Sequence, residues 1–277
     1  MMSFMQKLTT STVCPSLLWI NDWLKEKAWT VPPFETNSCV IDPKRGRNEE
    51  SLPPLAILVF NPEDLAHFSS SFTRPPRRSH KLYLSEVLTG DCNGTALALV
   101  GPMLGAPQSV LVFEKMIALG AKKFIAVGWC GSLLADVRIG DIVLPAGAIS
   151  EEGTSNHYPG IECVPSSNLY SSLKSALSLT GLTIHEGSVW TTDAPFRETC
   201  SKVKAFQSKG VLSVDMETSA LFCVSRFRGV DLAAVLVVSD NLSSLKWVHG
   251  FRNPEFHESR KRIIESILGS ISMFDGD

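Results

Sequence analysis

The stretch that decides the fold is SVLVFEKMIALGAKKFIAVGWCGSL, residues 109–133. Its first half has the apolar spacing of a helix that stops at Gly120, and its second half is an apolar run that leads into glycines. A helix followed by a strand that is apolar on both faces is typical of a sheet covered by helices. We therefore expect a helix–strand unit here, with the strand at 122–133 entering a glycine turn.

The same alternation continues along the chain. Further strands are predicted at residues 55–60, 95–102, 140–149, 183–193, 210–217 and 231–240, and further helices at 169–179, 199–208, 217–228 and 254–271. This pattern predicts a single α/β domain whose sheet lies between layers of helices. Residues 1–50 are predicted to be an N-terminal extension that contains a short amphipathic helix, Leu17–Trp29, with the domain proper at 51–277.

The composition excludes several classes of protein. The 277-residue chain is 44% hydrophobic and has a formal net charge of -2, so the basic stripe of a nucleic-acid binder is not expected. No apolar stretch reaches about 18 residues, and the first residues lack the apolar core of a signal peptide. The seven scattered cysteines are typical of a reduced, cytoplasmic protein. No cofactor or metal site is expected, and neither a membrane nor a nucleic acid is an expected partner.

Polar residues and glycines gather where the predicted strands end. These ends are residues 101–102 (GP), 128–132 (GWCGS), 191–193 (TTD), 215–217 (DME) and 239–240 (SD). In an open α/β sheet, ligands bind beyond the carboxyl ends of the strands. Any strand must end in turn residues, so a single end means little, but the set predicts a pocket for a small molecule.

Three of these motifs, taken in order, resemble a known group of enzymes. GPMLGAPQSVLVFEKMIALGAKKFIAVGWCGSLL (101–134), VDMET (214–218) and VVSD (237–240) resemble the nucleoside phosphorylase/nucleosidase superfamily over roughly residues 55–270. That group includes hexameric-type purine nucleoside phosphorylases, uridine phosphorylases and methylthioadenosine/S-adenosylhomocysteine nucleosidases. The resemblance implies a three-layer fold with a central mixed sheet in residues 51–277, and a homo-oligomer, either a dimer or a hexamer.

The implied reaction is cleavage of a nucleoside at its N-glycosidic bond, with release of the nucleobase, in purine or pyrimidine salvage. The acceptor is phosphate in a phosphorylase, which is a glycosyltransferase, and water in a nucleosidase, which is a hydrolase. The sequence leaves these two open. A catalytically inactive nucleoside-binding or storage-type protein on the same fold is the alternative. A Rossmann-like or flavodoxin-like binder is disfavoured because VFNPEDL (59–65) has no phosphate-cradling glycine.

The resemblance implies which residues bind the ribose and which residue donates the proton. Glu217 is expected to accept hydrogen bonds from the 2'- and 3'-hydroxyls, because a carboxylate is an acceptor with two oxygens. Met216 is expected to pack on the sugar, and Asp215 to make a further ribose contact or to support one. Asp240 is the expected catalytic acid, which protonates the base as the bond breaks. From the residues alone, Asp215 and Asp240 could each instead cap a helix.

The stretch WTTDAPFRET (190–199) falls where the family places its base-binding loop. Phe196 is expected to stack on the base, and Thr192, Asp193 or Arg197 to read its edges, although an ordinary surface loop fits equally well. Pyrimidine-specific members use a glutamine–arginine pair in this region. Arg197 has no such glutamine beside it, which weakens uridine as the substrate.

The anion site departs from the family pattern. Gly128, Trp129, Gly131 and Ser132 are the expected phosphate or water pocket. The family's two arginines and hydroxyl residue align with Ala126, Asp64 and Trp129, respectively an apolar, an acidic and an aromatic residue. If phosphate is used, other cations must hold it. The candidates are Arg74, Arg77 and Arg78, which a neighbouring subunit would contribute. The alternative is that these arginines form an ordinary solvated basic loop.

Overall fold

The structure is a computed structural model that describes residues 39–158 and 160–275. The secondary structure given below belongs to one compact unit, Pro43–Asp277. The predicted helix Leu17–Trp29 lies outside the described residues. Residues 43–50 belong to the compact unit, where Lys115 binds Glu49 at 2.6 Å. The proposed boundary between an extension and the domain at residue 50 stays a prediction.

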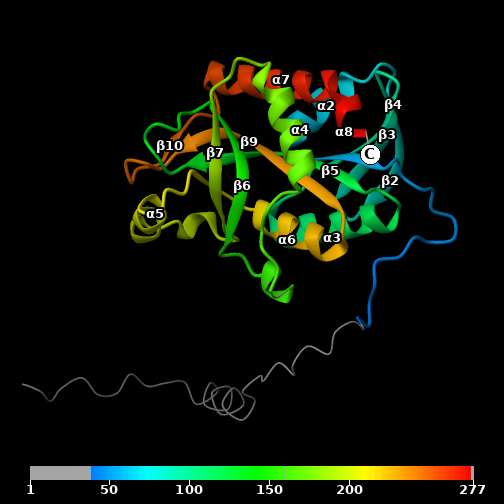
Figure 1. Cartoon of the computed structure of the whole chain (residues 1–277), viewed down its shortest axis with the longest axis horizontal. Coiled ribbons are helices and arrows are strands. Elements are labelled where there is room, and N and C mark those ends of the chain that lie inside the picture. Colours follow the sequence, from blue (N-terminus) through cyan, green and yellow to red (C-terminus); the bar gives the residue numbers. More distant parts are fainter. Residues whose placement is uncertain (1–38, 159, 276–277) are drawn as a thin grey trace, which may run out of the picture. The chain divides into compact units, whose positions relative to one another are not determined.

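The described strands form one mixed sheet in the order β10–β9–β6–β7–β8–β5–β1–β4–β3–β2 (Figure 1). The strands are β1 Leu55–Val59, β2 Arg77–Leu82, β3 Ser85–Cys92, β4 Thr95–Gly101, β5 Lys123–Ser132, β6 Ile142–Ser150, β7 Ile184–Thr191, β8 Ser213–Asp215, β9 Asp231–Asn241 and β10 Val248–His249. Strand β5 also pairs with β9, so β5, β9, β6, β7 and β8 close on themselves. The expected α/β fold with a central mixed sheet is confirmed.

The middle of the sheet is parallel and apolar on both faces. Strands β4, β1, β5 and β9 run parallel, and every residue of β1 is buried. Burial on both faces explains why these strands are continuous apolar runs in the sequence. Parallel strands place their carboxyl ends at one edge of the sheet, and this shared edge positions the site described below.

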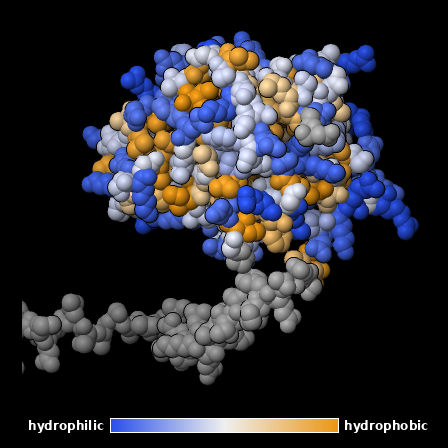
Figure 2. All heavy atoms as spheres, viewed as in Figure 1, coloured by the Kyte–Doolittle hydropathy of each residue, from blue (hydrophilic) through white to orange (hydrophobic). Residues whose placement is uncertain are grey.

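Helices cover both faces of this sheet (Figure 1). They are α2 Pro62–Ser70, α3 Gly105–Ala118, α4 Ser167–Ser178, α5 Cys200–Gln207, α6 Thr218–Arg228, α7 Pro254–Gly269 and α8 Ile271–Asp275. Residues of α2, α4, α7 and α8 share one core cluster with the sheet, and residues of α3 and α6 share another. No helix in residues 39–158 and 160–275 has the length and apolar character needed to cross a membrane. On the face seen in Figure 2, apolar side chains are interspersed with charged ones.

The expected glycine turn after the strand at 122–133 is wrong. Strand β5 continues through Gly128 and Gly131 to Ser132, because β9 pairs with it along this whole length, with only a bulge between Cys130 and Gly131. These two positions require glycine because a Cβ atom would clash with neighbouring side chains. A Cβ on Gly128 would lie 2.7 Å from the Phe60 ring, and one on Gly131 would lie 2.9 Å from a carboxylate oxygen of Asp240.

A second difference is the hairpin of β2 and β3, which the sequence pattern does not predict. Arg77 and Arg78 lie in β2, an edge strand that pairs antiparallel with β3. Arg77 forms an ion pair with Glu50 at 2.5 Å, and Arg78 forms one with Glu86 at 3.2 Å. Edge strands often carry such charges, which discourage pairing with another chain.

Candidate functional site

The site is built around the carboxyl end of β5. Gly131 pairs with Val214 of β8 on one side and with Asp240 of β9 on the other. The segment that holds Asp215 and Glu217 and the strand end that holds Asp240 are therefore both neighbours of Gly131. The thiol of Cys130, the preceding residue, reports the same arrangement. Burial raises its pKa, and the charges of both Asp215 and Asp240 raise it further.

Glu217 stands between β8 and the start of α6, with its side chain 7% exposed. One carboxyl oxygen, Oε1, accepts a hydrogen bond of 2.6 Å from the backbone N–H of Gly105, at the start of α3. Burial raises the pKa of Glu217 to about 8; the nearby charge of Asp215 adds to this, while the N–H groups of Gly105 and Met216 oppose it. A buried carboxyl with raised proton affinity is a common feature of functional sites. Met216 beside it is half-buried.

Asp215 is engaged inside the chain. Its Oδ1 accepts a hydrogen bond of 2.6 Å from the Thr191 hydroxyl, and its Oδ2 accepts the backbone N–H of Thr218 at 2.9 Å as well as the Thr218 hydroxyl. Burial raises the pKa of Asp215, and these hydrogen bonds oppose that effect. Asp215 thus ties β7 to the first turn of α6 and holds the segment that carries Glu217. Its expected ribose contact stays a prediction.

Asp240 lies near the end of β9 and is half-buried. Its Oδ1 accepts the Ser239 hydroxyl at 2.6 Å, and its Oδ2 accepts the indole N–H of Trp247 at 2.9 Å. Asp240 does not precede a helix directly, because its backbone pairs with His249 of β10 and the next described helix, α7, begins only at Pro254. The helix-cap alternative for Asp240 is therefore wrong.

The structure divides the predicted base-binding residues into two groups. Thr192 is buried, and its backbone N–H donates to the Asp215 carbonyl at 3.0 Å, next to the acids. Asp193 is exposed and accepts the Gly153 N–H at 2.8 Å. Phe196 and Arg197 lie in a short 3-10 helix, Pro195–Arg197, and both are exposed, with the Phe196 side chain fully so. Contacts of these four residues with a base stay predictions.

Glu198 is a candidate that the sequence analysis missed. It directly follows this 3-10 helix and is half-buried. Burial raises the pKa of Glu198 to about 7, and the charge of Asp240 adds to the effect, while Lys202 opposes it. Its only sequence signal was its place inside WTTDAPFRET. Glu198 is therefore a further candidate residue, whose charge interacts with that of Asp240.

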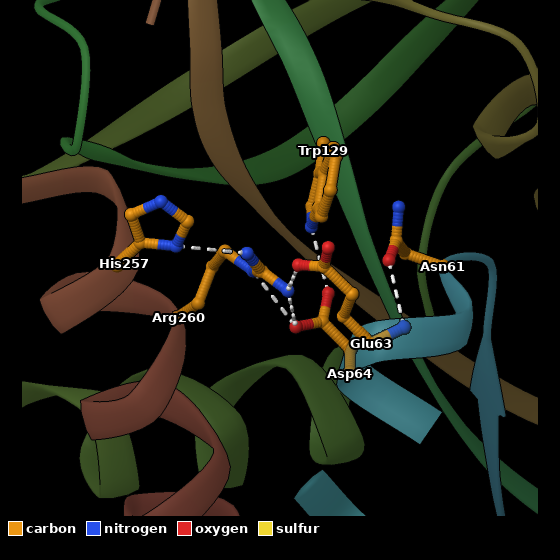
Figure 3. A network of polar contacts seen from close by, with 6 residues as sticks. All are labelled: Asn61, Glu63, Asp64, Trp129, His257 and Arg260. Atoms are coloured by element: carbon orange, nitrogen blue, oxygen red, sulfur yellow. Dashed lines mark hydrogen bonds and ion pairs between the residues drawn. The ribbon is translucent and has the colours of Figure 1, made fainter. Parts of the chain in front are cut away.

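A closed polar network fills the position of the expected anion site (Figure 3). Asp64, in the first turn of α2, is 2% exposed. Its Oδ2 accepts the indole N–H of Trp129 at 2.7 Å, and its Oδ1 accepts Nε of Arg260 at 2.8 Å. Arg260 also donates to Glu63 at 3.0 Å through Nη2. Asp64 is therefore neutralised by a residue of α7, which lies on the same face of the sheet as α2.

Aromatic rings hold this network in place. The guanidinium of Arg260 lies 4.5 Å from the centroid of the Trp129 ring and 5.2 Å from that of Phe256. The two rings meet edge to face, with centroids 5.0 Å apart. A cation over an aromatic face is stabilised by the ring's electron density. Arg260 is only 7% exposed and packs tightly, which fixes the position of Trp129.

The other residues at or near the expected pocket make the following contacts within the chain, and the role of Gly128, Gly131 and Ser132 in a phosphate or water pocket stays a prediction. Ala126 is a core residue, 1% exposed. Ser132 is fully buried, and its hydroxyl accepts a hydrogen bond of 2.6 Å from Asn241. Gly128 and Gly131 give room to Phe60 and Asp240, as described above. Arg77 and Arg78 lie on β2, at the opposite edge of the sheet from β10, so within this chain they do not join the acids.

The chain is similar to known proteins over most of the part that the structure describes. The model of the phosphorylase superfamily matches residues 54–269. The chain belongs to the phosphorylase superfamily. A guanosine phosphorylase of Halorubrum lacusprofundi is 30% identical over 185 residues, which are 66% of this chain and 77% of that protein. A DeoD-type purine nucleoside phosphorylase of Bacillus cytotoxicus is 34% identical over 159 residues, 56% of this chain and 67% of that one.

Solved structures of superfamily members share the fold. Uridine phosphorylase from Vibrio fischeri superposes with a TM-score of 0.74 at 21% identity, covering 85% of this chain and 99% of that one. Purine nucleoside phosphorylase from Toxoplasma gondii, in complex with immucillin-H, gives 0.75 at 19% identity, covering 86% and 97%. The expected family, the fold and an enzyme that cleaves the glycosidic bond of nucleosides are confirmed. The catalytically inactive alternative receives no support.

Proposed function

We propose that this superfamily member cleaves the N-glycosidic bond of a purine nucleoside and releases the free base. The observation that carries the proposal is the position of Gly131 between β8 and β9, which brings the Asp215–Glu217 segment and Asp240 to one strand end. The names of the relatives, guanosine and purine nucleoside phosphorylase, favour a purine. A homo-oligomer, a place in the cytoplasm and a role in nucleoside salvage are parts of the same proposal.

The proposed roles follow from the hydrogen-bonding capacity of each group. Oε1 of Glu217 already binds Gly105, so Oε2 and the remaining lone pairs of Oε1 are offered to the ribose hydroxyls. Met216 packs beside the sugar. Asp240 gives a proton to the base nitrogen as the glycosidic bond breaks, since a neutral leaving group departs more easily than an anion. Thr192 contacts the base from the adjoining loop.

The direct test is an assay for free base. Purified full-length protein is incubated with guanosine, inosine, adenosine, methylthioadenosine and uridine. We expect release from at least one purine nucleoside and slower release from uridine. Failure to release base from any of the five would refute the proposal, and uridine as the best substrate would refute its purine part.

The raised pKa of Glu217 predicts a pH dependence. In the free enzyme the carboxyl is protonated below about 8, and the form that accepts from both ribose hydroxyls is the ionised one. Because kcat/KM reports the free enzyme, we expect the limb of its pH profile that Glu217 controls to rise as the pH approaches about 8. Glu217→Gln should lose this rise.

The same substitution should lower kcat/KM by about 100-fold, since a hydrogen bond to a charged group is worth about 1.5–3 kcal/mol. Glu265→Gln, at an exposed position of α7, is the matched control and should behave as wild type. A pH profile of Glu217→Gln that matches the wild-type profile would remove Glu217 from ribose binding.

A further inference from the structure

The polar network of Asp64, Trp129 and Arg260 lies at the same edge of the sheet as the proposed site. Strand β1 pairs in parallel with β5, with Val59 opposite Val127, and Asp64 follows the end of β1 in the first turn of α2. Trp129 is two residues before Gly131 in β5. The network therefore adjoins the position to which Asp240 is paired.

The positive charge in this network, the guanidinium of Arg260, is already bound to acidic side chains. Arg260 donates Nε to Asp64 and Nη2 to Glu63, and the face of its guanidinium lies over the Trp129 ring. Its side chain is only 8% exposed, so little of it remains for another anion. The amino end of α2 is occupied as well, because Glu63 and Asp64 stand in its first turn.

The neighbouring charges are mostly negative. Asp240 is paired to Gly131 at the end of β5, and Asp215 and Glu217 directly follow Val214, the other residue paired to Gly131. Lys202, on α5, pairs with Glu151 at 2.5 Å. Anionic oxygens need unpaired guanidinium or ammonium groups, or free N–H groups at a helix start. A phosphate dianion would instead meet carboxylates, and the repulsion grows as water is excluded.

We infer that the acceptor is water, so that this superfamily member is a nucleosidase that hydrolyses its substrate. The inference rests on the proposed function and names the second substrate of that site. An uncharged acceptor is not repelled by the acids. The names of the relatives point to phosphate as the acceptor. In this chain, however, Trp129, Asp64 and Arg260 are in contact with one another at this edge.

The reaction then balances without any further reactant. The C1'–N bond breaks and its electron pair stays on the base nitrogen, which takes a proton from Asp240. A lone pair of the water oxygen forms the new C1'–O bond. The proton that the water loses restores Asp240. Nucleoside and water are consumed, and free base and ribose are produced.

The experiment measures both the rate and the sugar product. Phosphate-free full-length protein is incubated with the best nucleoside from the assay above, with and without added inorganic phosphate, and free ribose is separated from ribose 1-phosphate. We expect the same rate in both mixtures and ribose as the sugar product. Ribose 1-phosphate, formed at a rate that rises with phosphate, would overturn the inference and leave the proposed function standing. Absence of base release in both mixtures would overturn both.

Discussion

Asp240→Ala is expected to lower kcat/KM for base release by at least about 100-fold, since a positioned general acid contributes roughly 100- to 10,000-fold. The base would then have to leave without the proton of the acid that is paired to Gly131. The measurement is a steady-state assay of the variant beside wild type. Circular dichroism and thermal unfolding check that the fold is retained.

The matched control for this variant is Asp231→Ala. Asp231 begins the same strand, β9, but is exposed at the opposite end. It should keep wild-type activity. Equal losses of activity in both variants would mean that the loss comes from a disturbance of β9 and not from removal of the Asp240 carboxyl. Wild-type activity in Asp240→Ala would remove Asp240 from the mechanism.

Arg260→Met is expected to lower the free energy of unfolding by about 3–5 kcal/mol, the usual cost of leaving one partner of a buried ion pair alone. Asp64 is 2% exposed and would lose its cation, while Glu63 at the surface would lose little. Urea unfolding followed by fluorescence measures the loss. The exposed neighbour Lys261→Met should change the stability far less.

A double variant separates the charge effect from lost packing. In Arg260→Met with Asp64→Asn, the new side-chain amide oxygen still accepts from Trp129, and no buried charge is left unpaired, since Glu63 is at the surface. This variant should regain a large part of the stability lost in the single one. If the double variant is no more stable than Arg260→Met, the contribution of Arg260 is packing on Trp129 and Phe256 and not neutralisation of Asp64.

The apolar runs carried most of the fold prediction. Strands such as 55–60 and 231–240 are buried on both faces. Their sequences are therefore continuous apolar runs, which are easy to recognise as strands. The β2–β3 hairpin was missed because β2 is a polar edge strand with mostly exposed side chains. The glycine turn was predicted wrongly because glycine near a strand end usually marks a turn. At Gly128 and Gly131 it instead makes room for Phe60 and Asp240.

The sequence could predict only those parts of the site that lie within short continuous motifs. The acids Asp215, Glu217 and Asp240 stand at the ends of predicted strands, so the sequence alone indicated that they gather at one edge. The partner of Asp64 could not be found this way, since Arg260 is far along the chain on α7 and its sequence context is that of an ordinary amphipathic helix. The sequence aligns the acid Asp64 with an expected anion site and does not explain its charge. In the structure, Arg260 neutralises Asp64 within a buried network.

The central claim is that Glu217 and Asp240 act on one nucleoside. The most direct test is a crystal structure of an Asp240→Asn variant, expected to be slow because the amide cannot act as the acid, soaked with the nucleoside that the assay selects. We predict that a carboxyl oxygen of Glu217 lies within hydrogen-bonding distance of the ribose hydroxyls and that the substituted side chain at position 240 faces the base. A nucleoside bound elsewhere, or one that touches only one of these two side chains, would contradict the account.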